Sequence, residues 1–587
     1  MNRREFLQLL AAAYLAGFKT NANASSNNLN YNYSFNSDIR LLHITDTHAQ
    51  LMPSYFREPN INLGTGFNKN VPPHIVGENF LNFYSLDGDF NKYVYSYLNY
   101  NELASRYGKF GGYAYLKTAI EQLRGEAEGN SLLLDGGDTW QGSAISLFLN
   151  GMDMVEASNI LGVDIMTGHW EFTFGEEQFK KNLSKFNGEF IANNVFLNDE
   201  AIFNDIEAYN EDNHFQKPFT IKELNGRKIA VIGQAFPYTP IANPSRFVSN
   251  LTFGIREQEL QTTLNKVKNK HKPDLVVLLS HNGIDVDKKL ASRVEGIDFI
   301  LGGHTHDAVP RPISVKNRSG ETVVINSGCN GKFISMLDVK FQGNSYTYQY
   351  NLIPILSSVL TKNSQMESFI TKVSKPYKKL LNQKIGYTSD TLYRRSNFNG
   401  TFDDFLCDSM NAVLGTEISL SPGFRWGATL LPNQAITLND IYNHTAITYP
   451  NTYIREMDGL TIKNILEDVA DNIFNNGPYL QQGGDMVRTR GIKYTINPKN
   501  KINNRIINLR LNNDLPIKNN KKYKVSGWAS VNNIESGEPI WKVAEDYLKS
   551  IGTYKVDNST KINVIGKMII SALIFRQNFV LVLKFLG

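Results

Sequence analysis

Short apolar runs alternate with amphipathic helical stretches between Ile39 and about Val339. The apolar runs predict strands at Ile39–Thr45, Ser131–Leu134, Asp164–Thr167, Phe190–Ala192, Lys228–Gly233, Asp274–Ser280, Asp298–Leu301 and Thr322–Asn326. Helical spacing of apolar residues predicts helices between them, at Tyr113–Glu126, Glu176–Lys185, Glu257–Lys270 and Asp287–Glu295. This alternation of strands and helices is typical of a layered α/β domain.

The pattern changes after this region, and 587 residues are too many for one core. A polar, lysine-rich helical stretch at about Thr361–Leu381 precedes a region with mixed helix and strand signals. We therefore expect a catalytic domain over 38–360, a linker helix over 361–385 and a C-terminal substrate-binding domain over 386–565.

Residues 51–112 show no clear periodicity and are rich in Tyr, Asn and Phe. A segment of this length is typically either functional or disordered. Its aromatic content argues against disorder, because disordered segments contain few aromatic residues.

Both ends of the chain carry apolar stretches. Arg3 and Arg4 precede a short apolar run and a small-residue site at Ala22–Ala24, which resembles a twin-arginine export signal. We expect residues 1–24 to be a signal peptide and the protein to be periplasmic.

The apolar tail at 566–587 contains Arg576, and a central arginine costs roughly 2.5–3.5 kcal/mol on membrane insertion. A packed or aberrant tail is therefore favoured over a membrane anchor, and the role of this tail stays open.

Composition changes this picture little. The net charge is only +5 and no dense run of Lys and Arg is present, so nothing indicates nucleic-acid binding. Cys329 and Cys407 fit no zinc-binding spacing. Two buried thiols are the favoured interpretation, and a disulfide between them stays open.

Seven polar residues follow the ends of predicted strands. They are Asp46 and His48 in ITDTHAQ, Asp138 in LLLDGGDTWQG, His169 in MTGHWEF, His281 in LLSHNG, and His304 and His306 in LGGHTHD. In open α/β sheets, ligands collect at the carboxyl ends of the strands. Carboxylate and imidazole ligands suit divalent transition ions, so the sequence predicts a two-metal site.

In this order the motifs resemble the calcineurin-like metallophosphoesterases, and within them the 5′-nucleotidase branch. The resemblance implies a layered α/β/β/α catalytic domain and a smaller α+β C-terminal domain of 5′-nucleotidase type. It also implies two ligand groups that share a bridging carboxylate: Asp46, His48, Asp138 and His306 for one metal, and Asp138, His169, His281 and His304 for the other.

One motif departs from the 5′-nucleotidase branch, which usually has Gly-Asn-His-Glu-Phe-Asp where this chain has Gly168–Thr173. The asparagine ligand becomes His169, the branch's catalytic histidine becomes Trp170, and the aspartate that orients it becomes Thr173. A phosphomonoester expels a poor leaving group, and general acid–base help is worth roughly 10²–10⁴-fold. We therefore expect a bond whose leaving group departs without a proton, such as a thiolate or persulfide.

Further segments resemble the SoxB thiosulfohydrolase subfamily of bacterial sulfur oxidation. They include SYFREPNINLG at 54–64, SGCNGK at 327–332, SPGFRWG at 421–427 and GWASVNNIESGEPIW at 527–541. The resemblance implies two Mn²⁺ ions, with Zn²⁺ as the alternative. The implied substrate is a cysteine S-thiosulfonate on the SoxYZ carrier, and the implied products are sulfate and a carrier-bound persulfide.

Two further residues receive roles, each with an alternative. Arg425 is the candidate for binding the sulfonate, since a guanidinium matches tetrahedral oxyanions bidentately; the alternative is an ordinary surface arginine. Trp170 would wall the site and exclude water, or it is plain core packing. The segment 51–112 would line a channel for the carrier arm. A periplasmic 5′-nucleotidase and a scaffold with a vestigial metal site are the competing functions, and we expect a monomer.

Overall fold

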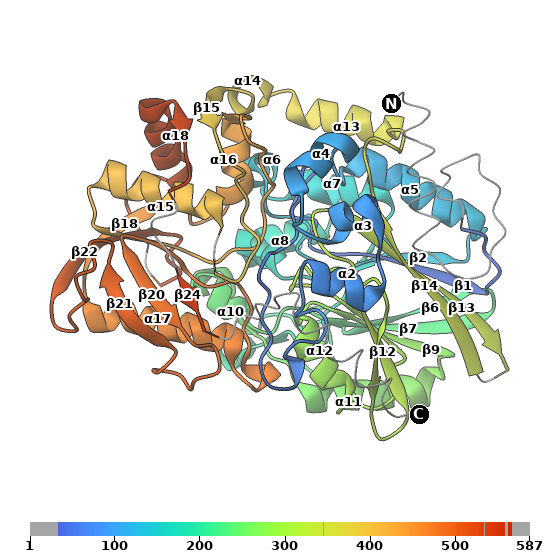
Figure 1. Ribbon diagram of the computed structural model, residues 1–587. Coiled ribbons are helices and arrows are strands. Elements are labelled where there is room, and N and C mark those ends of the chain that lie inside the picture. Colours follow the sequence, from blue (N-terminus) through green and yellow to red (C-terminus); the bar gives the residue numbers. More distant parts are fainter. Residues whose placement is uncertain (1–32, 344, 399, 533, 558–561, 566–587) are drawn as a thin grey trace, which may run out of the picture.

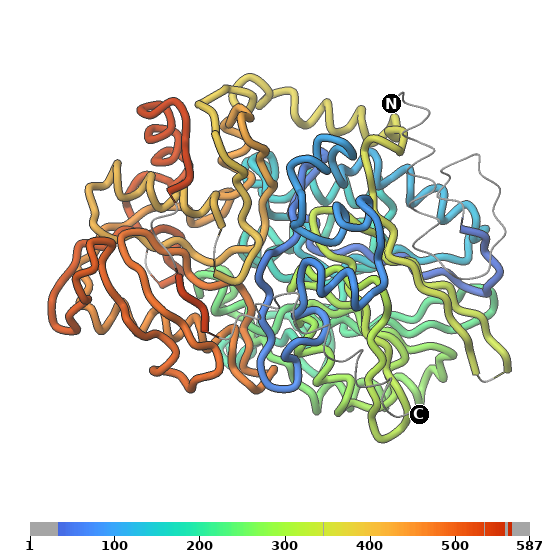
Figure 2. Tube along the Cα trace, viewed as in Figure 1, coloured from blue at the N-terminus to red at the C-terminus, as the bar shows by residue number. Residues whose placement is uncertain are grey.

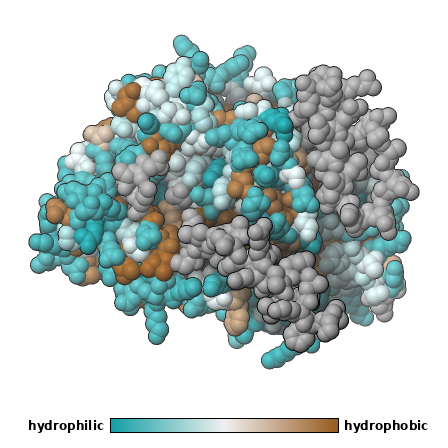
Figure 3. Space-filling view, viewed as in Figure 1, coloured by the Kyte–Doolittle hydropathy of each residue, from teal (hydrophilic) through white to brown (hydrophobic). Residues whose placement is uncertain are grey.

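The computed structural model describes residues 33–343, 345–398, 400–532, 534–557 and 562–565. The expected signal peptide at 1–24 and the apolar tail at 566–587 lie outside them. In this described part, no helix is long and apolar enough to cross a membrane. The face shown in Figure 3 is mainly hydrophilic, with apolar side chains in limited patches.

Two six-stranded sheets form the centre of the N-terminal region, drawn blue to yellow-green in Figure 1. The first sheet has the order β14-β13-β1-β2-β3-β4, with bounds Ser345–Pro354, Phe333–Gln342, Ile39–Ile44, Ser131–Asp135, Ile165–Met166 and Glu189–Phe190. The second has the order β11-β12-β10-β9-β7-β6, with bounds Ile313–Lys316, Glu321–Asn326, Phe299–Gly302, Leu275–Ser280, Arg227–Gln234 and Phe219–Leu224.

The sheets pack face to face because alternate residues of their apolar central strands meet in one cluster between the sheets. Leu41 and Leu134 of the first sheet share one buried cluster with Val277 and Leu301 of the second. The outer faces are covered by helices, through contacts such as Leu42 of β1 with the layer of α5. Helices α5 (Tyr113–Glu126), α7 (Met152–Leu161) and α8 (Glu176–Leu183) cover the first sheet, and α11 (Glu257–His271) and α12 (Ile284–Ala291) cover the second. The expected α/β/β/α layering is confirmed.

The segment 51–112 contains three short helices that its sequence pattern does not predict, α2 (Glu78–Tyr84), α3 (Gly88–Tyr95) and α4 (Tyr100–Tyr107). The aromatic side chains of α3 and α4 form a cluster with Phe333 and Leu352, on the two antiparallel strands at one edge of the first sheet. The expectation that this segment is ordered is confirmed, and its aromatic residues are largely core residues.

The predicted linker contains α13 (Ser364–Ser374) and α14 (Lys378–Leu381). Met366, Phe369 and Ile370 of α13 are buried in the cluster under α5 and α7, so this helix is part of the layer over the first sheet. Figure 2 shows the same segment in yellow, crossing along the top of the view toward the C-terminal region.

The C-terminal region is a smaller α+β unit, drawn orange to red in Figure 1. Its largest sheet has the order β18-β22-β16-β19, with bounds Thr452–Asp458, Lys522–Trp528, Ile418–Ser421 and Arg488–Arg490. Helices α15 (Thr401–Leu414), α16 (Leu438–Thr445), α17 (Gly459–Phe474) and α18 (Ile540–Ile551) pack around the sheets of this unit. A capping box between Thr437 and Asp440 begins α16.

Candidate metal centre

The seven sequence-predicted ligands lie just beyond the carboxyl ends of five strands. Asp46 and His48 follow β1, Asp138 follows β2, His169 follows β3, His281 follows β9, and His304 and His306 follow β10. The first four residues come from one sheet and the last three from the other. The structure therefore brings all seven together across the seam between the two sheets.

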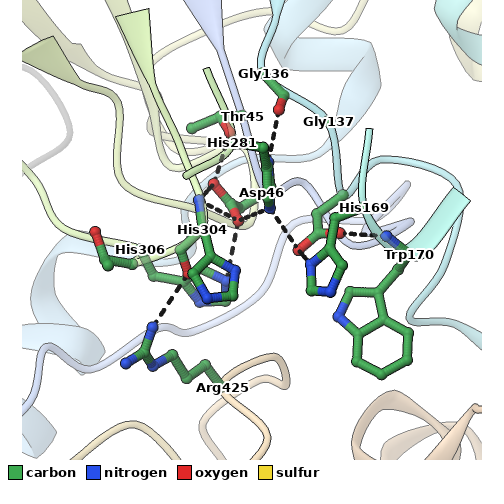
Figure 4. A network of polar contacts seen from close by, with 12 residues as sticks. Thr45, Asp46, Gly136, Gly137, His169, Trp170, His281, His304, His306 and Arg425 are labelled. Atoms are coloured by element: carbon green, nitrogen blue, oxygen red, sulfur yellow. Dashed lines mark hydrogen bonds and ion pairs between the residues drawn. The ribbon is translucent and has the colours of Figure 1, made fainter. Parts of the chain in front are cut away.

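Figure 4 shows the side chains of five of them converging on a common point: Asp46, His169, His281, His304 and His306. The ligand atoms of Asp46, His48, Asp138 and His306 all lie within 4.8 Å of one another, and so do those of Asp138, His169, His281 and His304. Asp138 Oδ2 is 3.1 Å from His281 Nε2 and 3.2 Å from His169 Nδ1. Because Asp138 belongs to both groups, its carboxylate is placed to bridge two ions.

The backbone is strained at most of these positions. Five of the seven ligands have a left-handed φ between 46° and 73°: Asp46, His48, Asp138, His304 and His306. This region is uncommon for residues other than glycine, and such strain is retained where the surrounding structure imposes it, often at functional sites. At Gly303 a Cβ atom would lie 2.4 Å from Thr45 Oγ1, so only glycine fits beside the ligands.

Opposite charges control the titration of the central groups. Burial disfavours ionisation of Asp138, but His169 and His281 hold the pKa of its carboxyl well below the usual range. Burial alone would lower the pKa of His281, but Asp138 and Asp46 raise it to about 10. Without metal, His281 thus stays protonated beside the carboxylates of Asp138 and Asp46. A position between two carboxylates also suits a metal cation.

Burial keeps three further histidines of the site in the neutral form that can bind a metal. Burial lowers the pKa of His48 to about 4, and it lowers the pKa values of His304 and His306 well below the usual range. Their imidazoles are therefore neutral at neutral pH, as a metal ligand requires.

The donor set leaves a central ring nitrogen that a metal would satisfy. His281 Nε2 has no hydrogen-bond partner in the described part of the chain, and it lies 3.1 Å from Asp138 Oδ2 and 3.6 Å from Asp46 Oδ1. The other ring nitrogen of His281 donates to the Gly136 carbonyl at 2.6 Å, as the second nitrogen of a ligating histidine usually does. The two groups fit a dinuclear metal site.

Glu171 is a site residue that the sequence did not reveal. Its side chain is fully buried, and its carboxylate accepts backbone N–H bonds from Asp138, Thr139, Trp140 and His169 at 2.7–3.2 Å. It therefore ties the loop that carries one ligand to the loop that carries another. The sequence signal that could have identified Glu171 is its position two residues after the predicted ligand His169.

A cavity of about 410 Å³ opens beside the ligands, between the N-terminal and C-terminal regions. Six aromatic side chains form part of its wall: Trp170, Phe236, Tyr238, Phe424, Trp426 and Tyr449. Trp170 lines the cavity and is only 5% exposed, within the buried core cluster that also contains Trp426. It therefore serves both as cavity wall and as core packing. No residue of 51–112 lines this cavity in the described structure, and the channel for a carrier arm stays a prediction. Asn62, Leu63 and His74 line a smaller cavity next to it.

Arg425 is held beside the centre rather than on the surface. Its guanidinium donates to the His304 carbonyl at 3.3 Å and to the Gly484 carbonyl at 2.5 Å, and its side chain is 11% exposed. Asp485 lies 3.8 Å from Arg425 Nε, which balances the buried charge.

The other candidates of the sequence are structural. Cys329 and Cys407 are buried and free, as favoured. The histidines outside the predicted set belong to neither ligand group of the described residues: His43, His74, His214, His271 and His444.

Comparisons with known proteins agree with this architecture. Residues 39–308 match the calcineurin-like phosphoesterase family, and residues 384–533 match the 5′-nucleotidase C-terminal domain. The structure is similar to a sulfate thiohydrolase SoxB from Thermus thermophilus, with a TM-score of 0.85 and 32% identity over 92% of this chain and 98% of that one. A 5′-nucleotidase precursor from the same species shares the fold, with a TM-score of 0.70 and 20% identity over 90% of this chain and 100% of that one.

Sequence relatives include nucleotidases. The trifunctional nucleotide phosphoesterase YfkN of Bacillus subtilis is 26% identical over 67% of this chain, but the match spans only 28% of YfkN. A snake venom 5′-nucleotidase of Gloydius brevicauda is 24% identical over 76% of this chain and 82% of its own. This chain is therefore a metal-dependent hydrolase that belongs to the calcineurin-like phosphoesterase family, in the branch with a 5′-nucleotidase C-terminal domain.

Proposed function

We propose that the protein is a periplasmic thiosulfohydrolase that acts on a cysteine S-thiosulfonate carried by SoxYZ. In this reaction water attacks the terminal sulfonate sulfur, one S–O bond forms, and the S–S bond breaks with its electron pair on the carrier sulfur. Sulfate and a carrier persulfide are the products. Likeness to a SoxB enzyme over 92% of the chain supports the proposal.

The observation that carries the proposal is the position of Trp170. Its backbone N–H donates to Asp138 Oδ1 at 2.8 Å, and its indole ring lies 5.0 Å from the His169 ring, between centroids. Trp170 thus stands beside the ligand groups, where an acid would protonate a leaving alkoxide. An indole cannot donate that proton usefully, and a persulfide leaves as an anion without one.

The residues of this chain then have separate tasks. Two divalent cations, which we propose to be Mn²⁺, supply Lewis acidity and a nucleophilic hydroxide near neutral pH when bound. Arg425 lies at the cavity wall, where its guanidinium would bind the sulfonate oxygens and fix their orientation. Trp170 and Phe236 exclude bulk water from the reacting sulfur, which strengthens these charge interactions.

The cavity wall also offers no slot for a nucleoside base between Phe424 and Trp426. These two rings of the C-terminal region stack on each other with centroids 4.2 Å apart and an interplanar angle of 28°. Because the two rings contact each other directly, a nucleoside base cannot insert between them. This arrangement supports a substrate without a base.

A periplasmic 5′-nucleotidase remains the second candidate, because the named sequence relatives are nucleotide phosphoesterases. The test compares two substrates with purified protein and Mn²⁺. We expect sulfate release from thiosulfonate-loaded SoxYZ and negligible phosphate release from AMP. Rapid AMP hydrolysis would establish the nucleotidase instead, and two bound ions with neither activity would establish a scaffold.

A further inference from the structure

The loop that carries His304 and His306 is held from the C-terminal region. Arg395 Nη2 donates to the Thr305 carbonyl at 2.9 Å, and Arg425 Nη1 donates to the His304 carbonyl at 3.3 Å. We infer that the C-terminal region is part of the metal centre and that Gly483 is the positioning residue that sets the His304 ring. The inference rests on the proposed metal site and adds a residue outside its ligand set.

Gly483 approaches His304 more closely than any side chain allows. A Cβ atom on Gly483 would lie 2.1 Å from His304 Nε2, a separation that no real Cβ atom adopts. The ring cannot move aside freely, because one of its faces stacks on Phe236 with centroids 4.0 Å apart. His169 and His281 crowd its other sides, at 5.2 and 5.4 Å between centroids. A methyl group at position 483 would therefore displace the imidazole from its ligand group.

The loop that contains Gly483 is itself fixed. Asp485 forms a backbone N–H bond with the Gly423 carbonyl at 2.9 Å, and its buried carboxylate lies 3.3 Å from Arg488 and 3.5 Å from Arg395. Arg395 also lies 3.4 Å from Asp307, one residue beyond the second histidine of the loop. The ligand loop and the glycine loop thus share one buried charge network, which keeps Gly483 against the ring.

The neighbouring glycine provides a matched control. Gly483 and Gly484 both have a φ of 80°, so an alanine at either position costs similar backbone strain. A Cβ atom on Gly484 would meet nothing closer than the Gly423 carbonyl oxygen, at 3.7 Å, which is an ordinary contact. Only the substitution at position 483 adds the collision with His304.

The test counts bound Mn²⁺ in wild type, G483A and G484A by elemental analysis after gel filtration. Electron paramagnetic resonance of the same samples detects the coupled signal of two neighbouring Mn²⁺ ions. We expect two equivalents and a coupled signal for wild type and G484A, and one equivalent with an uncoupled signal for G483A. The single remaining ion would show that Asp46, His48 and His306 are still in place.

Three results would overturn the inference. G483A could keep two ions and the coupled signal; both variants could lose an ion equally, which would show backbone strain alone; or G483A could lose both ions, which would show that the whole loop moved rather than His304. Wild type without Mn²⁺ would instead refute the proposed metal site itself.

Discussion

The substitution Glu171→Gln tests whether one buried carboxylate organises the centre. The amide group of glutamine keeps one acceptor oxygen and places an NH₂ group where the other oxygen stood. Two of the four backbone N–H groups that now bind Glu171 would then face a donor. A buried donor left unpaired costs about 1–3 kcal/mol, so the expected loss is about 2–6 kcal/mol.

The cost should appear as local opening of two loops. Each 1.36 kcal/mol is a tenfold change in an equilibrium, so 2 kcal/mol accelerates amide exchange by roughly thirtyfold where exchange follows local opening. The assay is hydrogen–deuterium exchange of peptides that cover 136–142 and 168–172. Glu177→Gln, at an exposed position on α8, is the matched control and should leave exchange unchanged. Unchanged exchange in the Glu171 variant would refute the reasoning.

Three further predictions concern charge and metal. Asp138→Ala should lose both Mn²⁺ ions in elemental analysis, because Asp138 belongs to both ligand groups; two retained equivalents would contradict the bridge. Trp170→His with Thr173→Asp should raise AMP hydrolysis by roughly 10²–10⁴-fold, and no gain would show that cavity shape sets the specificity. Burial alone would raise the pKa of Glu189, but two neighbouring lysines lower it to about 2. Its stabilisation is thus fully present above the unfolded pKa of about 4.5 and is lost as pH falls through 2. Glu189→Gln should therefore cost about 1–3 kcal/mol in urea unfolding at pH 7 and progressively less as pH falls toward 2. A difference that stays constant with pH would contradict this.

Most central strands were predictable because both of their faces are buried, although β13 was missed while its residues 333–339 are buried. β9 and β10 read as continuous apolar runs, and the ligands could be found as the first polar residues after them. The edge strands β6 and β14 were missed because their residues are largely half-buried or exposed, which removes the apolar run. Helices α2 to α4 have seven or eight residues each, too few for a clear helical period.

The supporting residues of the site were missed for a different reason. Glu171 binds backbone N–H groups, which have no signature in the sequence of the loops that supply them. Gly483 fits beside His304 only because it has no side chain, and the two residues are far apart in the sequence. Trp170 and Arg425 were found because they lie inside recognisable sequence motifs. The contacts of Glu171 and Gly483, by contrast, join segments that meet only in the folded protein.

The placement of the ligands across both sheets has a consequence for biosynthesis. His48 and His306 are 258 positions apart in the chain, yet their Nε2 atoms lie 3.1 Å apart. A nascent polypeptide that ends before residue 306 holds only part of the donor set, however well its first sheet has formed. Metal acquisition is therefore a late event, and the cation pool that the finished polypeptide meets decides which element it takes up.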